Sequence, residues 1–550
     1  MLFSVVALFL VGSILWSLYT INREVSVLLP IDGGMLTEGI IGTPRFVNPV
    51  LAITRADLDL STLIYSGLMK VSVGGELVED LAESVTISTD GTVYSVTLKE
   101  DIFFHDGTPL TTADVAYTIA LIQDPELKSP HRGNWNNVRV EVISDREINF
   151  ILPEKYSPFI ENLTQGILPK HLWSQLTTEE IPFSQHNTEP IGSGPYKVAE
   201  VDRDAGGLIE SYKLVASKND LYKVKIDSIR VNFYDTEDTL LEDLKSGLVD
   251  ATGTLSTSVI SSLDESKFTK IQYPLPRTFG LFINHNKSSA LREKPVREAL
   301  NLAIDKEALV KEVLNNYGQP TDSPIPTGFY ALESDSPNEP ENTESRLAKA
   351  AALLEEAGWS KSDGGNWVKS VDDSEITLSV KITTANTEPF KSTAEFVKSS
   401  WEDLGVVVEV AKFDQSDLIQ SVIRPRDYQI LLFGADVGRG LDLYPFWHSS
   451  QREDPGLNVA LYTNIDADGY LEEYRVATEE TQKAELLKNI DDLIKKETYA
   501  ISLYNPVFVY VVRDDVGVFQ IDKIGKPSDR LYSINLWHLN EASVWPIFTK

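Results

Sequence analysis

His105 and Asp106 are adjacent in the stretch FFHDGTPLTTADVAYTIALI, and their types could supply a general base and its orienting carboxylate. A catalytic site of that kind also needs a nucleophile, and none accompanies the pair in its local context. The Asp-Gly dipeptide that follows His105 is typical of a turn, and Thr111 with Asp114 three positions later fits a capping box at a helix start. We therefore interpret the stretch as a strand that turns into a helix.

Other catalytic and metal chemistry finds little support in the chain. There is no cysteine, which excludes disulfides, thiolate ligands, cysteine nucleophiles and a cysteine-linked lipid. NIDADG, residues 464–469, begins like an EF-hand loop, but Arg475 occupies the twelfth position where a bidentate Glu is required, so we interpret it as a turn. The motifs G-x-S-x-G and H-E-x-x-H and a Walker lysine are absent, so we expect no catalytic residue, metal or cofactor. The seven histidines are too dispersed for a local pair of metal ligands: His105, His131, His171, His186, His285, His448 and His538.

Composition narrows the class of protein further. A chain of 550 residues with 42% hydrophobic and 24% charged residues is typical of a folded protein of several domains. Its formal net charge of -32 repels phosphate backbones and anionic lipid headgroups. Nucleic acid is therefore not an expected partner.

The N-terminus predicts where the protein is located. Residues 2–21 carry no charge and are about as long as a membrane span, with Trp16 and Tyr19 near the far end. We expect an uncleaved membrane anchor. A cleaved secretory signal is the alternative, although a basic n-region and an A-x-A-like site are missing. The segment LLPIDGG, residues 28–34, would tether a large acidic portion on the extracytoplasmic side.

The hydrophobic periodicity predicts a mixed α/β fold. Alternation favours strands at 92–101 and 147–154, and a helix is expected at 345–359. Between residues 376 and 433 the pattern reads strand, helix, strand, helix, strand, ending in DYQILLFG. Such units form parallel sheets that bind ligands beyond the carboxyl ends of their strands, so the end of DYQILLFG is a candidate site.

A second unit of this kind, at 226–253, indicates a second lobe. The proline-containing segments YPLPRT (273–278) and LYNPVF (503–508) could be two crossings between the lobes and thus a hinge. The alternative is that both are ordinary loops within one continuous core.

The run LAESVTISTDGTVYSVTLKEDIFFHDGTPLTTADVAYTI resembles the signature of extracellular solute-binding protein family 5, the oligopeptide-, dipeptide- and nickel-binding proteins of ABC transporters. The resemblance continues in order over most of the chain, through ILPKHLW, PIGSGPYKV, LKSGLVDA, FGLFINHNK, KPVREALNLAIDKEALV, AALLEEAGW and FWHSSQREDPGLNVALYTN. Each piece is modest alone, but their shared order is highly specific.

The resemblance implies an α/β, bilobal periplasmic-binding-protein-like (type II) fold with an extra N-terminal domain and two hinge crossings. The implied segments are a membrane anchor or signal at 1–22, a tether at 23–36, lobe I at 37–60, the extra domain of lobe I at 61–185, lobe I again at 186–275, lobe II at 276–503 and a lobe I return at 504–550.

The resemblance also implies ligand-binding residues near the end of DYQILLFG. In peptide-binding members an acidic residue after this strand pairs with the α-amino group of the ligand, and Gly434 and Asp436 match that pattern as part of GAD. A loop or helix-cap carboxylate is the alternative for Asp436. The sequence departs from the family in the following VGRGLDLYPFW, where Asp442 competes for the role.

Five further residues are candidates with a packing or solvent alternative. Trp135 lies where the extra domain of family members places an aromatic residue over the ligand, and Arg45 lies in a segment that resembles the strand lining the cleft. Phe433, Tyr444 and Trp447 could form a side-chain pocket around GAD, although core packing explains them as well.

The implied function is ligand capture without covalent chemistry. We expect a membrane-tethered, monomeric receptor that binds a peptide or a similar small solute between its lobes and delivers it to an ABC permease. An oligosaccharide or a metal chelate is the alternative ligand. An extracellular hydrolase or a sensor is the alternative class of protein.

Overall fold

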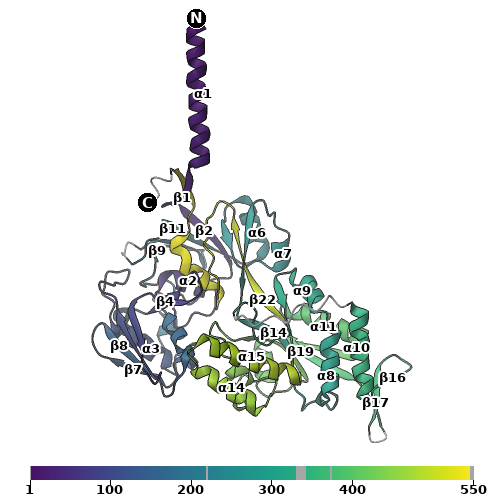
Figure 1. Ribbon diagram of the computed structural model, residues 1–550. Helices are drawn as coiled ribbons and strands as arrows, with labels where there is room; N and C mark the ends of the chain where they lie inside the picture. The colour runs from purple at the N-terminus through teal and green to yellow at the C-terminus, as the bar shows by residue number, and fades with distance from the viewer. Residues whose placement is uncertain (1, 218–220, 330–341, 372–373, 546–550) are drawn as a thin grey trace.

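Two sheets that share one long strand organise the chain. The computed structural model describes residues 2–217, 221–329, 342–371 and 374–545. The shared strand is β22 (Ala500–Arg513), whose first half pairs in lobe II and whose second half pairs in lobe I. Figure 1 shows the two lobes side by side, joined along β22.

The sheet of lobe I is built around parallel pairing to β2 (Met35–Ile41), which lies between β11 and β12. Residues of β2 and β11 pair in register from Met35 with Ser228 to Ile41 with Tyr234. The other strands of this sheet are β9 (Tyr196–Arg203), β10 (Ile209–Ala216), β11 (Ser228–Tyr234), β12 (Ala251–Thr252) and β13 (Phe268–Pro274).

The sheet of lobe II contains a parallel trio beside an antiparallel strand. In it β19 (Ser379–Ala385) pairs in parallel with β20 (Val407–Phe413) and β21 (Ile430–Asp436), and β14 (Arg277–Ile283) runs antiparallel to β21. The short strand β15 (Gly318–Pro320) adds to β22. The parallel sheet expected between residues 376 and 433 is thus confirmed, although buried Leu378 separates β19 from β18 (Ser374–Thr377).

Two chain segments cross between the lobes. The first joins β13 to β14 through the Pro-Leu-Pro sequence at 274–276, and the second is β22 itself, with Pro506 near its middle. Proline fixes φ and cannot donate to a ladder, which suits it to the point where a strand leaves one sheet for another. The predicted bilobal fold with two crossings is confirmed, and the alternative of a single continuous core is not.

The helices of lobe II pack by apolar stripes of helical spacing. In α11 (Phe390–Leu404) the buried residues Ala394, Val397, Trp401 and Leu404 recur every three or four positions, and the helix ends at Gly405 with φ 99°. The other helices of this lobe are η4 (Ala290–Arg292), α8 (Lys294–Ala303), α9 (Lys306–Leu314), α10 (Thr343–Glu356), α12 (Gln415–Asp417), η5 (Leu418–Ile423), α13 (Tyr444–Trp447), η6 (Ser449–Gln451), α14 (Ile465–Val476) and α15 (Glu480–Glu497).

A four-stranded antiparallel sheet and α3 (Thr112–Gln123) form an additional body that shares one apolar core with lobe I. Val115, Ile119 and Ile122 of α3 are fully buried, as the predicted helix requires. The strands are β5 (Ala82–Ile87), β6 (Val93–Leu98), β8 (Glu147–Ile151) and β7 (Arg139–Val142) in spatial order. Nearby short elements are β3 (Met69–Val71), β4 (Leu77–Glu79), α4 (Arg132–Trp135), η1 (Ser157–Thr164), α5 (Lys170–Trp173), η2 (Ile181–Phe183) and η3 (Gln185–Asn187).

A buried ion cluster fastens the C-terminal segment to lobe I. Arg530 in η7 (Pro527–Leu536) bonds Asp59 in α2 (Arg55–Ile64), with Nη1 to Oδ1 at 3.0 Å, and it also bonds Glu38 of β2. Burial lowers the pKa of Arg530, but the carboxylates of Asp59 and Glu38 outweigh it and hold that pKa well above its ordinary value. Four further elements are α6 (Glu237–Ser246), α7 (Thr257–Ser261), β16 (Ser360–Lys361) and β17 (Trp367–Val371).

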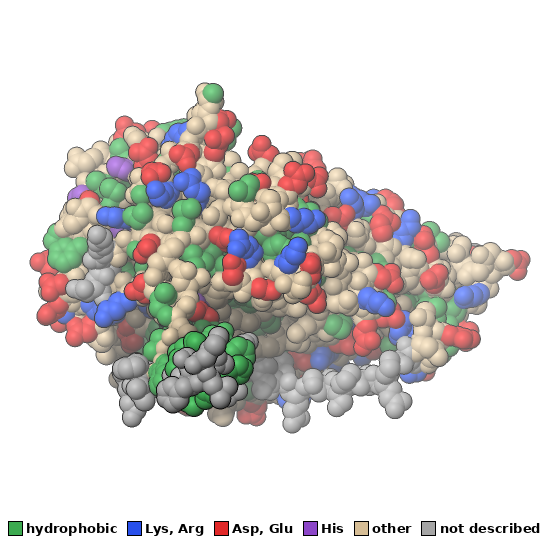
Figure 2. All heavy atoms as spheres, turned by 90° about the horizontal axis from the view of Figure 1, so that it is seen from above, with side chains coloured by type: hydrophobic (Ala, Val, Ile, Leu, Met, Phe, Trp, Pro, Cys, Tyr) green, Lys and Arg blue, Asp and Glu red, His purple; other side chains and the backbone are tan. Residues whose placement is uncertain are grey.

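The first and last strands of the chain lie beside lobe I. Helix α1 (Leu2–Val25) projects from the molecule, and β1 (Val27–Ile31), within the expected tether, pairs antiparallel with β23 (Asn540–Val544) (Figure 1). Among the residues that the structure describes, no helix has both the length and the apolar character of a membrane span. Figure 2, a view from above, shows acidic and basic side chains interspersed over this face and apolar side chains gathered on α1.

The sequence NIDADG does not form the expected turn. Asn464 is the N-cap of α14, and its side chain accepts hydrogen bonds from the backbone N–H groups of Asp466 and Ala467. The acidic residues that resemble an EF-hand loop therefore occupy the first turn of a helix. Their negative charges stabilise the helix there, because the N-terminal end of a helix dipole is positive.

Candidate functional site

The carboxyl ends of the parallel strands of both lobes face each other. Because β22 runs from lobe II into lobe I and is antiparallel to β14 and β12, β21 ends toward lobe I and β2 ends toward lobe II. Open α/β sheets bind ligands at such edges. The junction between the lobes is therefore the candidate site.

Asp436 ends β21 at this junction, directly opposite Arg277, the first residue of β14. Its Oδ2 accepts hydrogen bonds from Nη2 of Arg277 at 2.5 Å and from Nε at 3.2 Å. Its Oδ1 accepts the backbone N–H of Gly438 at 3.2 Å. The predicted amine anchor is thus already paired with an arginine on the neighbouring strand.

Asp442 lies six residues beyond Asp436 and connects the lobes. Its Oδ2 accepts from Nη2 of Arg475 at 2.7 Å and from the hydroxyl of Tyr156 at 3.0 Å. Tyr156 packs with the core of lobe I, whereas Arg475 belongs to α14 of lobe II. Burial and the Asp442 carboxylate both raise the pKa of Tyr156, which keeps its hydroxyl a donor.

A second interlobe contact joins Arg439 to Glu161 of η1. Nη2 of Arg439 lies 2.6 Å from Oε2 of Glu161, and both side chains are largely buried. Burial lowers the pKa of Arg439, but the Glu161 carboxylate outweighs it, so that pKa lies above its ordinary value. Nη1 of Arg439 is buried without a hydrogen-bond partner among the described residues. Burying this unpaired donor costs free energy, which reduces the net stabilisation from the contact.

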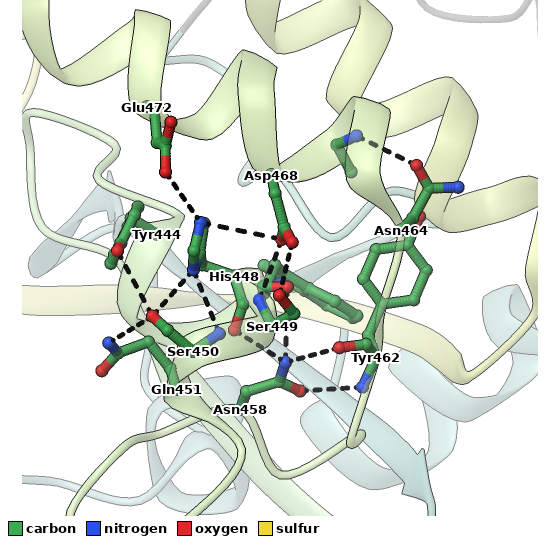
Figure 3. A network of polar contacts seen from close by, with 12 residues as sticks. Tyr444, His448, Ser449, Ser450, Gln451, Asn458, Tyr462, Asn464, Asp468 and Glu472 are labelled. Atoms are coloured by element: carbon green, nitrogen blue, oxygen red, sulfur yellow. Dashed lines mark hydrogen bonds and ion pairs between the residues drawn. The ribbon is translucent and has the colours of Figure 1, made fainter.

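Tyr444 lies in a stack rather than in an open pocket. Its ring stacks on that of His448, with 4.1 Å between the ring centroids. The guanidinium carbon of Arg475 lies 3.9 Å from the centroid of the Tyr444 ring. Figure 3 shows His448 pointing toward Ser450, Asp468 and Glu472 in a network that holds α13 against α14. These contacts fix the loop that carries Asp442.

The other aromatic candidates are packed. Trp447 is buried between Phe282 and Tyr462, and Trp135 is buried against Phe150 and Phe159. Both positions favour the packing alternative, because neither indole is exposed at the junction between the lobes.

Phe433 and Gly434 lie on β21 itself, and both are half-buried. A Cβ at Gly434 would meet the ring of Phe279 at 3.2 Å, so a close approach to the neighbouring strand accounts for this glycine. Arg45 is exposed just beyond the carboxyl end of β2, and its backbone N–H bonds Asp57 at 2.7 Å. Its guanidinium lies beside the ring of Phe46, within reach of solvent.

The pair His105 and Asp106 has the structural role predicted for it. His105 bonds the carbonyl oxygen of Gly194 through Nε2 at 3.0 Å, and Asp106 accepts the backbone N–H of Thr108 within the turn. Asp114 accepts the backbone N–H of Thr111 at 2.9 Å at the start of α3. The other carboxylate oxygen of Asp106 lies 2.7 Å from Nε2 of His171 in α5, so the motif also connects the turn to neighbouring segments of the same body.

Four residues of the junction were not among the sequence candidates: Tyr156, Glu161, Arg277 and Arg439. Arg277 stands directly after the proline-rich crossing, and Arg439 lies in the segment where the chain departs from the family pattern. Those two positions were visible signals. Nothing local distinguishes Tyr156 or Glu161, because their partners lie 286 and 278 residues away.

Two other features lie apart from this junction. A pocket of about 500 Å³ is lined by α9, α10 and α11 of lobe II, with an ion pair of 2.9 Å between Arg346 and Asp305 on its wall. Within the described part of the chain, no group of three or more His, Asp and Glu side chains is arranged to hold a metal ion.

Comparison with known proteins agrees with this geometry. The family model of bacterial extracellular solute-binding proteins, family 5, matches residues 76–454. The oligopeptide-binding protein AppA of Bacillus subtilis is 25% identical over 520 residues, which is 93% of this chain and 92% of that protein. Its structure with a nonapeptide superposes with a TM-score of 0.70 over 93% of this chain and 100% of the other. The structure of the substrate-binding protein CtaP of Listeria monocytogenes superposes with a TM-score of 0.75 at 25% identity. The match covers 92% of this chain and 99% of the other.

The fold and the junction define a two-lobed ligand-binding protein. Because the family model spans more than half of the chain, the protein belongs to family 5 of the bacterial extracellular solute-binding proteins. Members of this family bind their ligands without catalysis, outside the cytoplasm.

Proposed function

We propose that this protein captures a peptide, or a similar small solute, between its lobes and delivers it to the permease of an ABC importer. The observation that carries the proposal is the opposition of two carboxyl-terminal sheet edges across a junction that two chain segments cross within the described residues. AppA is similar to this protein over almost the whole chain, and its structure contains a bound nonapeptide. This supports a peptide as the ligand.

Ligand binding would favour the closed arrangement of the lobes. A ligand that contacts both edges binds the closed form more tightly than the open form, and this differential affinity shifts the equilibrium. An extended peptide can pair its main chain with protein backbone while its side chains occupy hydrated pockets, which permits a loose sequence preference.

The proposed contacts on lobe II lie at the end of β21, where Phe433, Gly434, Asp436 and Asp442 lie in or follow the strand. Arg45 is the proposed contact from lobe I. We further propose that the segments 276–503 and 37–275 with 504–550 move as the two bodies.

Membrane attachment through residues 1–22 is part of the proposal. Residues 2–21 are uncharged, and Leu8, Phe9 and Trp16 on α1 are 74%, 81% and 71% exposed. Apolar side chains displayed on a helix that projects from the protein suit a lipid environment. Release of the full chain from membranes by detergent but not by high salt is the expected result.

Mass spectrometry of material that co-purifies with the protein tests the ligand class. Peptides of mixed sequence are the expected result, followed by saturable binding of synthetic di- to pentapeptides in calorimetry. Tight binding of a sugar or a metal chelate, without binding of any peptide, would replace the proposed ligand.

A further inference from the structure

Asp436 has little capacity left for a ligand amine. A carboxylate offers about four acceptor positions, and here Oδ2 takes two N–H groups of Arg277 while Oδ1 takes the backbone N–H of Gly438. An ammonium group carries three N–H donors and would also meet the positive charge of Arg277. The pairing therefore weakens the anchor that the family resemblance implies.

Arg277, in contrast, has donors to spare. A guanidinium has five N–H groups in a planar fork, and only Nε and Nη2 bond Asp436. Within the described residues, Nη1 has no hydrogen-bond partner, and the side chain is 36% exposed. The outer edge of the fork is thus open to a ligand.

The backbone holds Arg277 in place at the junction. Its carbonyl oxygen accepts a hydrogen bond from Nδ2 of Asn505 on β22 at 3.1 Å, and its N–H donates to Leu275 in the first crossing at 2.7 Å. Both chain crossings therefore fix this one residue. An ion pair as exposed as that of Arg277 with Asp436 contributes little to stability, so stability alone does not account for it.

We propose that Arg277 binds the ligand and that the group it binds is a carboxylate. Asp436 then orients the guanidinium instead of binding an amine. Planar guanidinium and carboxylate groups match in two-point, charge-assisted hydrogen bonds, which makes arginine suited to this task. The inference rests on the proposed function and adds to it the charge of the ligand group at this edge. The C-terminal carboxylate of a peptide and an acidic side chain share this chemistry.

Calorimetry on the full chain in detergent tests the inference. Each peptide is supplied with free ends, with an acetylated N-terminus and with an amidated C-terminus. Amidation is expected to weaken binding about ten- to a hundredfold, and acetylation to leave it nearly unchanged. Amidated peptides with a Glu side chain that retain affinity would assign the side chain as the source of the carboxylate.

Variants separate the roles of the pair. Arg277→Gln is expected to weaken binding of the free peptide about as much as amidation does, and to abolish the preference for the free C-terminus. Arg277→Lys, which keeps the charge without the fork, should fall between. Arg424→Gln is the matched control, because Arg424 is an exposed arginine of the same lobe.

Two results would overturn the inference while leaving peptide binding intact. One is a loss of affinity on acetylation with no loss on amidation, which would restore Asp436 as an amine anchor. The other is an unchanged affinity in folded Arg277→Gln. If the glutamine variant fails to fold, the three peptide forms decide the matter on the wild-type protein. Wild-type protein that binds none of the peptides contradicts the peptide as the proposed ligand.

Discussion

At the scale of single residues, the junction between the lobes consists of charges that already have partners. Asp442 accepts from both Arg475 and Tyr156, so one carboxylate connects a helix of lobe II to a tyrosine of lobe I. Charge-assisted hydrogen bonds in partly buried surroundings are stronger than neutral ones. If the lobes open and close as proposed, these contacts contribute to the balance between the two forms.

Removing the Tyr156 hydroxyl should weaken closure. We expect Tyr156→Phe to reduce ligand affinity about three- to tenfold, because the contact with Asp442 exists only when the lobes meet. A double-mutant cycle with Asp442→Asn should give a coupling energy of about 1 kcal/mol in calorimetry. Additive effects of the two substitutions would mean that the hydrogen bond does not form in solution.

His105 should make stability depend on pH. Burial lowers its pKa from 6.5 to about 4, so between these values the unfolded chain binds a proton that the folded chain does not. Stability therefore falls as the pH is lowered through this window. Urea unfolding at pH 7 and pH 5 should show a loss for the wild type that is smaller in His105→Gln by roughly 1 to 2 kcal/mol. Equal losses in both proteins would contradict this.

At the scale of elements, local pattern carried most of the information. The stripe of α11, the alternation of β6 and the capping residues of α3 are all local signals, and each element formed where the pattern indicated. The pattern was weaker where an element changes within a run, as at buried Leu378 between β18 and β19. The N-terminus of α14 was wrongly predicted to be a turn, because turns and helix N-caps favour the same residue types, Asn and Asp.

Asp114 should be important for the stability of α3. Its carboxylate accepts the backbone N–H groups of Thr111 and Lys170, both at 2.9 Å, and it is buried. Asp114→Ala leaves both donors unpaired and should lower the free energy of unfolding by roughly 2 to 3 kcal/mol in urea titrations. Glu179→Ala, at an exposed position of the same body, should change it by less than about 0.5 kcal/mol. Equal effects would deny the cap its role.

At the scale of the whole molecule, the sequence indicated where the candidate site lies but not which residues contact each other there. The periodicity placed a strand end at Gly434, two residues before β21 ends, and the prolines marked both crossings. The contacts of Asp442 and Arg439 with lobe I join residues almost 300 positions apart, and nothing in a local window encodes such a pairing. The packed positions of Trp135 and Trp447 likewise depend on tertiary contacts.

The interlobe pair of Arg439 with Glu161 should favour the closed form even without ligand. We expect Glu161→Gln to increase the radius of gyration of the ligand-free protein in small-angle scattering, because a partly buried charge loses its partner. Saturating ligand should restore the compact value.

Glu100→Gln is the control for this experiment, since Glu100 pairs with Arg146 within a single body. The control should leave the radius unchanged. A radius equally unchanged in Glu161→Gln would show that this pair does not hold the lobes together.

The pairing of β1 with β23 has a mechanical consequence. It places the first and last strands beside lobe I, so any force applied through α1 is transmitted to that lobe first. If residues 1–22 attach the protein to a membrane and the lobes move as proposed, lobe II can move about the two crossings without displacing the attached helix. A fluorescent label fused to the C-terminus is then expected to stay with lobe I and to report the distance between that lobe and the membrane.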